Sequence, residues 1–386
     1  MKIFLRLSIC FVLLALAAIS FAQSRSTFRR KRFTAPPIQV SPPSGVVVQD
    51  QFGGQIFGYD IDRNGTEGIL SEAFFLRDGN LTIATETFDQ RTGKILKVVQ
   101  EKTETQDDFV TLGILGSHIG LAQTEHVKGF FVDKRTYATL DPLASNKITG
   151  KWTPPINNKT EFFEDVEGSQ GTPNVAVMAS DSNCCTRFVF GSSLAANTFG
   201  PKISLTDPSF EGGVPPMLAW NSKSQRAVVA QAEGGIFTIP QIGLVDLVKS
   251  KVVEFQGSGF GFVNGLAVDS TTDFACTTTE TDNSAEFYNL TKHSGIIVPL
   301  PFIGQYSAGL VASDPVHQLF LITHPVPLAP GQIHIYDEKG TLINSLLNIP
   351  MGPAGLYLAL NPSQRTGFYQ IAGKNQSGSA LQSFKY

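Results

Sequence analysis

Three stretches in the carboxyl-terminal half of the chain share one pattern: Gly265-Leu266-Ala267-Val268-Asp269, Gly309-Leu310-Val311-Ala312-Ser313-Asp314 and Gly355-Leu356-Tyr357-Leu358-Ala359-Leu360-Asn361. Each runs from a glycine through apolar residues to an aspartate or asparagine. Short apolar runs bounded by turn residues are typical of β-strands. Weaker copies end upstream at Asp78, Glu125, Asp181 and Asn221. Consecutive end positions lie between 40 residues (221 − 181) and 56 residues (181 − 125) apart, which predicts a structural repeat.

A second motif alternates with the first, a hairpin whose turn begins with an aspartate or asparagine. Its copies lie at Asp89, Asp133, Asp246, Asn289 and Asp337. Together the two motifs give each repeat enough chain for four short strands, which is what one propeller blade needs. The sequence therefore predicts an all-β fold, a β-propeller of seven blades. Six blades is the alternative, because the first repeat is short for a blade.

The two ends of the propeller region look complementary. The stretch Gly54–Asp60 is similar to Gly331–Asp337, which belongs to a hairpin in a later repeat. A ring with an unpaired seam would leave exposed sheet edges. We therefore expect the amino-terminal strands to close the last blade, which begins at Gly355.

The amino terminus has the pattern of a secretory signal. Lys2 and Arg6 precede an apolar run over Leu7–Ile19, and a small-residue cleavage site ends at Ala22. That run is shorter than the roughly 20 residues that a membrane-spanning helix needs. We therefore expect a signal peptide over 1–22 and a secreted protein, extracellular or periplasmic, with no integral membrane segment after cleavage.

Composition divides the remaining chain. Residues 23–44 are polar, basic and rich in proline, which predicts a disordered leader, and 45–386 form the propeller domain. Charged residues make up 16% of the chain and the net charge is −3, which argues against nucleic acid as a partner. Three cysteines remain in the mature protein, Cys184, Cys185 and Cys276. Their pairing is open: a vicinal disulfide, a bond to Cys276, or the favoured interpretation, buried free thiols.

The repeat pattern over 45–386 resembles secreted β-propellers with NHL-like, YVTN-like and gluconolactonase-like repeats, and uncharacterised secreted bacterial propellers. Val263-Asn264-Gly265-Leu266-Ala267-Val268-Asp269 is similar to the gluconolactonase-type motif, and the resemblance implies that Asn264 binds a catalytic metal. That family also uses an aspartate in the next blade. The matching stretch here, Gln305–Gly309, has no carboxylate.

Candidate ligands precede the predicted innermost strands, because the loop that leads into such a strand faces one mouth of the channel. Glu72, His118, Asn174 and Asn264 are the predicted metal ligands, with no catalytic residue identified. Oxygen donors favour Ca²⁺ or Mg²⁺, and an imidazole favours zinc or manganese. The alternative is structural, since Asn-Gly before a strand is common turn chemistry. The acidic stretch Glu161–Glu167 is interpreted as a solvated loop.

Two functions are consistent with this pattern. The favoured one is a non-catalytic binding or interaction scaffold, whose ligand is a protein, a glycan or a small molecule. The alternative is a metal-dependent, lactonase-like hydrolase with its site at the mouth of the channel. A propeller by itself does not decide between them, because the fold hosts many unrelated activities.

Overall fold

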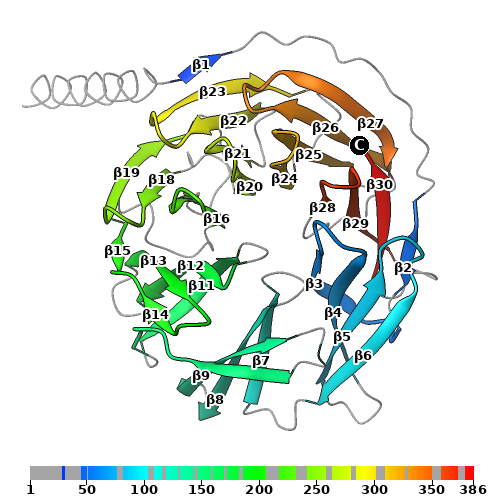
Figure 1. The fold of residues 1–386 in the computed structure, drawn as a ribbon, viewed down its shortest axis with the longest axis vertical. Coiled ribbons are helices and arrows are strands. Elements are labelled where there is room, and N and C mark those ends of the chain that lie inside the picture. The colour runs from blue at the N-terminus through cyan, green and yellow to red at the C-terminus, as the bar shows by residue number, and fades with distance from the viewer. Residues whose placement is uncertain are drawn as a thin grey trace, which may run out of the picture.

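The chain forms a ring of seven small β-sheets (Figure 1). The computed structural model describes residues 28–30, 45–49, 51–75, 81–102, 108–114, 119–128, 131–141, 144, 147–157, 160–168, 172–181, 186–205, 217–231, 241–257, 263–279, 284–300, 309–326, 329–349, 358–372 and 379–386. Each sheet is one blade of a seven-bladed β-propeller, which confirms the predicted fold and blade count. The predicted signal peptide lies outside the described residues.

The first three blades follow one another along the chain. Blade 1 contains β3 (Gln55–Ile61), β4 (Glu67–Phe75), β5 (Leu81–Asp89) and β6 (Ile95–Lys102). Blade 2 contains β7 (Asp108–Ile114), β8 (Gly120–Lys128), β9 (Phe131–Asp141) and β10 (Lys147–Trp152). Blade 3 contains β11 (Glu161–Gly168), β12 (Asn174–Asp181) and β13 (Arg187–Ser193), with β14 (Thr198–Phe199) and β15 (Ile203–Ser204) both paired to β13.

The last four blades repeat the same antiparallel order. Blade 4 contains β16 (Met217–Asn221), β17 (Arg226–Gln231), β18 (Gln241–Asp246) and β19 (Lys251–Gln256). Blade 5 contains β20 (Val263–Asp269), β21 (Phe274–Thr279), β22 (Ser284–Asn289) and β23 (Ser294–Pro299). Blade 6 contains β24 (Val311–Asp314), β25 (Leu319–Val326), β26 (Ala329–Asp337) and β27 (Leu342–Ile349). Blade 7 contains β28 (Leu358–Asn361), β29 (Thr366–Ala372) and β30 (Ser379–Lys385).

An amino-terminal strand closes the ring, as predicted. Strand β2 (Val47–Gln49) pairs antiparallel with β30 and becomes the fourth strand of blade 7, with Val48 opposite Leu381. The segment expected in that role is a different one, because Gln55–Ile61 forms β3, the innermost strand of blade 1. Within the predicted leader, β1 (Phe28–Arg30) pairs parallel with β23 at the outer edge of blade 5.

The repeat pattern locates the innermost strand correctly in blades 4 to 7 only. There the predicted strands coincide with β16, β20, β24 and β28. In blades 1 to 3 the pattern falls on the second strands, β4, β8 and β12. The innermost strands β3 and β11 each contain a register shift, and a bulge breaks the alternation that identifies a strand in sequence.

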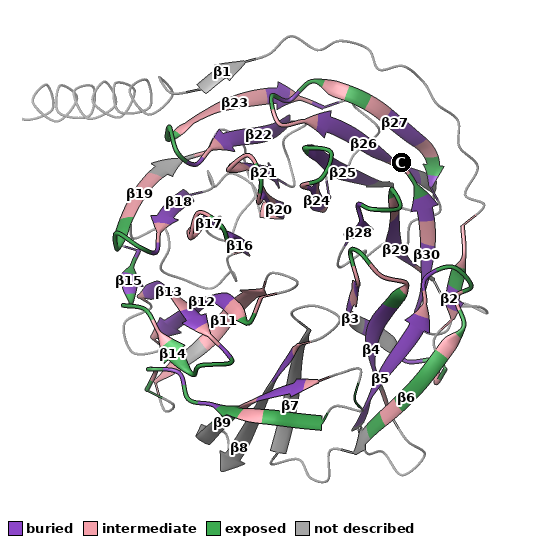
Figure 2. Cartoon of the chain, in the orientation of Figure 1, coloured by how far each residue is buried: buried purple, intermediate pink, exposed green. Residues whose placement is uncertain are grey.

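Many strand residues are buried (Figure 2), and the blades pack face to face through apolar side chains. Between blades 3 and 4, Met178 and Val189 pack with Trp220 and Val229. Each fully buried side chain of this size contributes roughly 1.5–3 kcal/mol through removal from water. The interfaces between blades therefore hold most of the hydrophobic stabilisation of the ring.

The aspartates and asparagines that mark the repeat are turn residues. Asn221 accepts backbone N–H bonds from Lys223 (2.9 Å) and Ser224 (3.3 Å) through Oδ1. Asp269 and Asp314 make the same bonds to the residues two and three positions later. Each of these turns ends in a left-handed residue, Gln225 (φ 54°), Asp273 (φ 61°) or Gln318 (φ 58°). We call the side of the ring that carries these turns the turn face.

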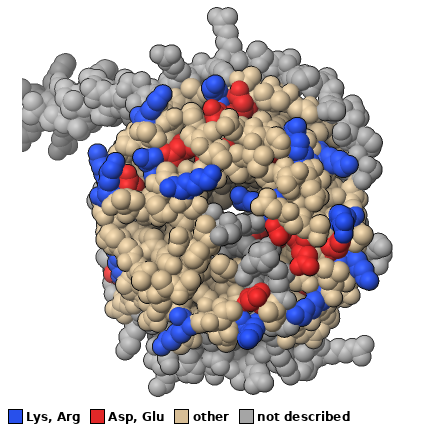
Figure 3. All heavy atoms as spheres, in the orientation of Figure 1, with Lys and Arg blue, Asp and Glu red and all other residues tan. Residues whose placement is uncertain are grey.

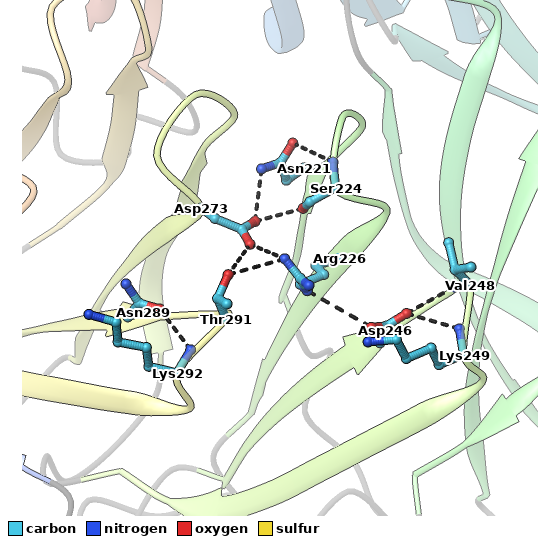
Figure 4. A network of polar contacts seen from close by, with 10 residues as sticks. All are labelled: Asn221, Ser224, Arg226, Asp246, Val248, Lys249, Asp273, Asn289, Thr291 and Lys292. Carbon is cyan, nitrogen blue, oxygen red and sulfur yellow. Dashed lines mark hydrogen bonds and ion pairs between the residues drawn. The ribbon is translucent and has the colours of Figure 1, made fainter.

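On the turn face, polar side chains tie neighbouring blades together (Figure 4). The Asp273 carboxylate of blade 5 accepts hydrogen bonds from Asn221 Nδ2 (2.9 Å) and Ser224 Oγ (2.6 Å) of blade 4. Arg226 of blade 4 also bonds to it, and Thr291 Oγ1 of blade 5 lies 2.8 Å away. These donors hold the pKa of Asp273 below its usual value against the opposing effect of burial. The carboxylate is therefore ionised and joins blades 4 and 5.

The turn residues of blades 6 and 7 also bond to the next blade, whereas in blade 5 it is Thr271 Oγ1 that donates to Pro315 O of blade 6 (3.0 Å). Asn361 Nδ2 reaches Gln90 of blade 1 (2.9 Å), and Asp314 Oδ2 accepts a bond from Tyr386 of blade 7 (2.9 Å). The equivalent Asp269 is fully buried, and its Oδ2 has no hydrogen-bond partner among the described residues.

We expect Asp269→Asn to raise the free energy of unfolding by about 1 kcal/mol, because a neutral amide costs less to bury without a partner than a carboxylate oxygen. The Oδ1 bonds of the turn are kept. The matched control is Asn221→Asp, which sets a second carboxylate against Asp273 and should destabilise. Urea unfolding of both variants checks the pair, and a loss of stability in Asp269→Asn would contradict this account of the turn.

Candidate functional site

The innermost strands surround the centre of the ring (Figure 1). Neighbouring innermost strands contact one another in the order β11, β16, β20, β24, β28, β3 and β7. Because the strands within a blade alternate in direction, all innermost strands begin on the same side of the ring. We call this side the front face; it lies opposite the turn face.

Of the four predicted metal ligands, only Asn264 lies on an innermost strand. It sits in β20 at a register shift between Val263 and Gly265, and it is half-buried. A bulge at this point redirects a side chain. Asn264 therefore lies near the start of an innermost strand, as predicted, and its role as a metal ligand stays a prediction.

The other predicted ligands lie elsewhere. Glu72 is fully buried in β4, the second strand of blade 1, and its Oε2 accepts the N–H of Gly54 (3.1 Å). Asn174 is the first residue of β12, the second strand of blade 3, opposite Ser193. His118 lies outside the described residues. The sequence pattern predicts Glu72 and Asn174 at the start of innermost strands. It fails there because in blades 1 to 3 the pattern falls on the second strand of the blade.

Metal binding remains a prediction for this channel. Among the residues that the structure describes, no three His, Cys, Asp or Glu side chains lie close enough together to hold a metal ion. Asn264 would bind a metal through its amide oxygen, and asparagine is not one of those four residue types. The two other described candidates, Glu72 and Asn174, are on different blades from Asn264 and are not brought to an innermost strand.

The strongest electrostatic feature of the channel is strand β11. The stretch Glu161–Glu167, interpreted from sequence as a solvated loop, is instead most of the innermost strand of blade 3. Glu164 lies at a register shift between Phe163 and Asp165. Its carboxylate forms a two-oxygen pair with Arg187, at 2.5 Å from Nε and 3.1 Å from Nη2, and both side chains are more than nine-tenths buried.

Asp165 and Glu167 follow on the same strand, and neither forms an ion pair of this kind with a described residue. The Asp165 carboxylate accepts the N–H of Leu218 in blade 4 (2.8 Å) and of Val166 (2.9 Å). Burial raises the pKa of Asp165 to about 6, the nearby charge of Glu164 adds to the rise, and the two N–H donors oppose it.

The pKa of Glu167 is raised well above its usual range. Burial is the largest cause, and the charges of Asp165 and Asp60 add to it, whereas Arg63 opposes it. Asp60 and Arg63 belong to blade 1, so the effect acts between blades 1 and 3. Both carboxyl groups therefore take up a proton more readily than free carboxyl groups do. Carboxyl groups with pKa values shifted to different extents are common at functional sites.

Strand β11 differs from the innermost strands of blades 4, 5 and 7. Their half-buried apolar residues Met217, Ala267 and Ala359 pack against the clusters between blades. In the space-filling view of one face, the centre of the ring is hollowed and acidic side chains gather beside the hollow (Figure 3). Of the described innermost strands, β11 carries the most carboxyl residues.

Sequence reasoning missed the β11 carboxyl groups for a physical reason. Phe163 and Val166 both pack into the cluster that includes Tyr137 and Val177, although a regular strand of period two would place them on opposite faces. The bulge at Glu164 shifts the alternation by one residue. The signal that remained was the run of carboxylates within a strand-length segment that contains Phe162 and Phe163.

Comparisons with known proteins support the fold. The chain is similar to the solved structure of the Dos1 propeller, with a TM-score of 0.54 and 10% sequence identity, over 86% of this chain and 93% of that one. No protein-family model and no curated protein matches the chain. A likeness at this level of identity shows a β-propeller and carries no activity. Among the described residues, no helix has the length and hydrophobicity to cross a bilayer.

Proposed function

We propose that this protein is a secreted, non-catalytic binding scaffold that takes its ligand in the central channel of the ring. The observation that carries the proposal is the group of carboxyl residues on β11, the innermost strand of blade 3, where the pKa values of Asp165 and Glu167 are raised. Titratable groups with shifted pKa values on a central strand are candidates for binding a ligand.

A carboxyl group can donate a hydrogen bond when it is protonated and only accepts hydrogen bonds when it is ionised. The raised pKa of Glu167 favours the donating form, and the Asp165 carboxyl group, with a pKa of about 6, offers acceptor oxygens at neutral pH. Asn264, from blade 5, supplies an amide on an innermost strand. The proposed ligand is therefore a small polar molecule or the exposed end of a glycan, held by polar groups from blades 3 and 5.

A second candidate is a metal-dependent hydrolase of the lactonase type. The observation that favours it is the place of Asn264, which lies at a bulge on an innermost strand as the resemblance to gluconolactonase-like propellers implies. Such an enzyme needs a cation to polarise a carbonyl group or to activate water. Asn264 would be one ligand.

Elemental analysis before and after chelation separates the two candidates when it is combined with a lactone hydrolysis assay. The scaffold proposal expects no stoichiometric divalent metal and no turnover. It also expects glycan-array binding that Asn264→Ala and Glu167→Gln weaken at least tenfold, and that Lys223→Ala, an exposed substitution on the turn face, leaves unchanged. A bound metal whose removal abolishes lactone hydrolysis would replace the scaffold proposal with the hydrolase.

A further inference from the structure

Two histidines are buried against each other in the interface between blades 5 and 6. His324 on β25 and His334 on β26 are each 1% exposed, and their rings meet edge to face with centroids 4.7 Å apart. His334 Nδ1 lies 2.7 Å from Ser345 Oγ on β27. Neither Nε2 atom has a hydrogen-bond partner among the described residues. The pair is therefore held by packing and by one hydroxyl group.

The strand register places the pair on the face that packs against blade 5. His334 lies opposite Ile322, and His324 lies two residues further along β25. Ile322 belongs to the cluster that joins blades 5 and 6, together with Cys276 and Phe287 of blade 5. The two imidazoles thus continue the apolar interface toward the front face.

The described side chains that face this interface from blades 5 and 6 are neutral. Blade 5 presents the Cys276 thiol and the Thr278 hydroxyl, which donates to Gly309 O (2.6 Å). Blade 6 presents the Tyr336 phenol and the Ser345 hydroxyl. The carboxylate of Glu286 on β22 is bonded to Tyr288, which packs toward blade 4. No described carboxylate is bonded to either histidine.

Protonation is therefore opposed in the folded state. Burial and the neighbouring His334 hold the pKa of His324 well below its usual range, and burial lowers the pKa of His334 to about 4. In the opened interface both rings return to the ordinary value of 6.5. Because the charged form is favoured only when the interface opens, the stabilisation is complete above pH 6.5 and falls as the pH drops toward 4.

We propose that the interface between blades 5 and 6 is an acid-labile seam, which opens when His324 and His334 take up protons while the other blade interfaces stay packed. For His334 alone, the pKa in the open and the closed interface differs by 6.5 − 4 = 2.5 pH units. At tenfold per unit, full protonation shifts the opening equilibrium roughly 300-fold. His324 adds to this shift.

Hydrogen exchange and thiol labelling test the seam directly. We expect exchange of β21, β22, β25 and β26, corrected for intrinsic rates, to rise at least roughly 100-fold between pH 7 and pH 4, where His334 has reached about half of its full effect. Blades 3 and 4 should change far less. Buried Cys276 lies in the same interface, so its labelling by 4,4′-dithiodipyridine, located by mass spectrometry, should follow the same pH dependence.

Variants identify the groups responsible. His324→Gln with His334→Gln should remove the pH dependence of Cys276 labelling, and the control His293→Gln, at an exposed turn position of blade 5, should keep it. If the double variant does not fold, ¹⁵N NMR of the wild-type imidazoles decides. Titration of both rings near pH 6.5, or an equal rise of exchange in all blades, would overturn the proposal.

Discussion

Replacing Arg187 by alanine is expected to lower the free energy of unfolding by about 3–5 kcal/mol, because it leaves the Glu164 carboxylate buried without its cation. The side chains of Arg187 and Glu164 are only 4% and 8% exposed. Arg187 also bonds to Gln231 of blade 4, so the substitution breaks a contact between blades as well. Urea unfolding followed by tryptophan fluorescence measures the loss.

The matched control for this prediction is Lys202→Ala. Lys202 pairs with Glu161 of the same blade (2.7 Å), but its side chain is 33% exposed, and a solvated pair of this kind contributes less than about 1 kcal/mol. Removing both charges, in Arg187→Met with Glu164→Leu, should restore part of the stability. Equal losses of unfolding free energy from Arg187→Ala and Lys202→Ala would show that the buried pair contributes no more to stability than the solvated one.

The second large effect is expected at the strand that closes the ring. Val48 is fully buried among Ile56, Phe368 and Leu381, which belong to blades 1 and 7. Val48→Asp should cost about 4 kcal/mol or more, because it buries a carboxylate without a partner and detaches β2 from β30. With β2 lost, the edge of β30 is left unpaired.

Val47→Asp supplies the control, since Val47 is on the same strand and 43% exposed. It should change the free energy of unfolding by less than about 0.5 kcal/mol. Limited proteolysis reports closure independently: the chain should be cut near β2 in Val48→Asp and resist cutting there in Val47→Asp. Similar behaviour of the two variants would mean that β2 does not hold the ring closed.

The sequence determined the fold because turn chemistry recurs with the blade. Asn221, Asp269 and Asp314 are needed wherever an innermost strand turns into the second, since their side chains bond to backbone N–H groups of the turn. This requirement is local, so it appears in the sequence at a regular period. Closure by an amino-terminal strand was predictable for a similar reason, because an open ring leaves exposed edges.

The site was less predictable because its residues come together only in the ring. Asn264 was located correctly, since blade 5 follows the repeat closely. Glu72 and Asn174 were assigned to innermost strands and are on second strands, because bulges disguise β3 and β11. The raised pKa of Glu167 depends on Asp60 and Arg63, more than 100 positions earlier in the chain.

By itself, then, the sequence determined the all-β fold, the count of seven blades and the turns that define each repeat, because these depend on contacts between near neighbours. Only the tertiary structure decided which strands line the channel, which carboxyl groups face one another across it, and that His324 and His334 are buried together. Those properties depend on the packing of blades, in which burial and the charges of distant residues set the protonation of each group.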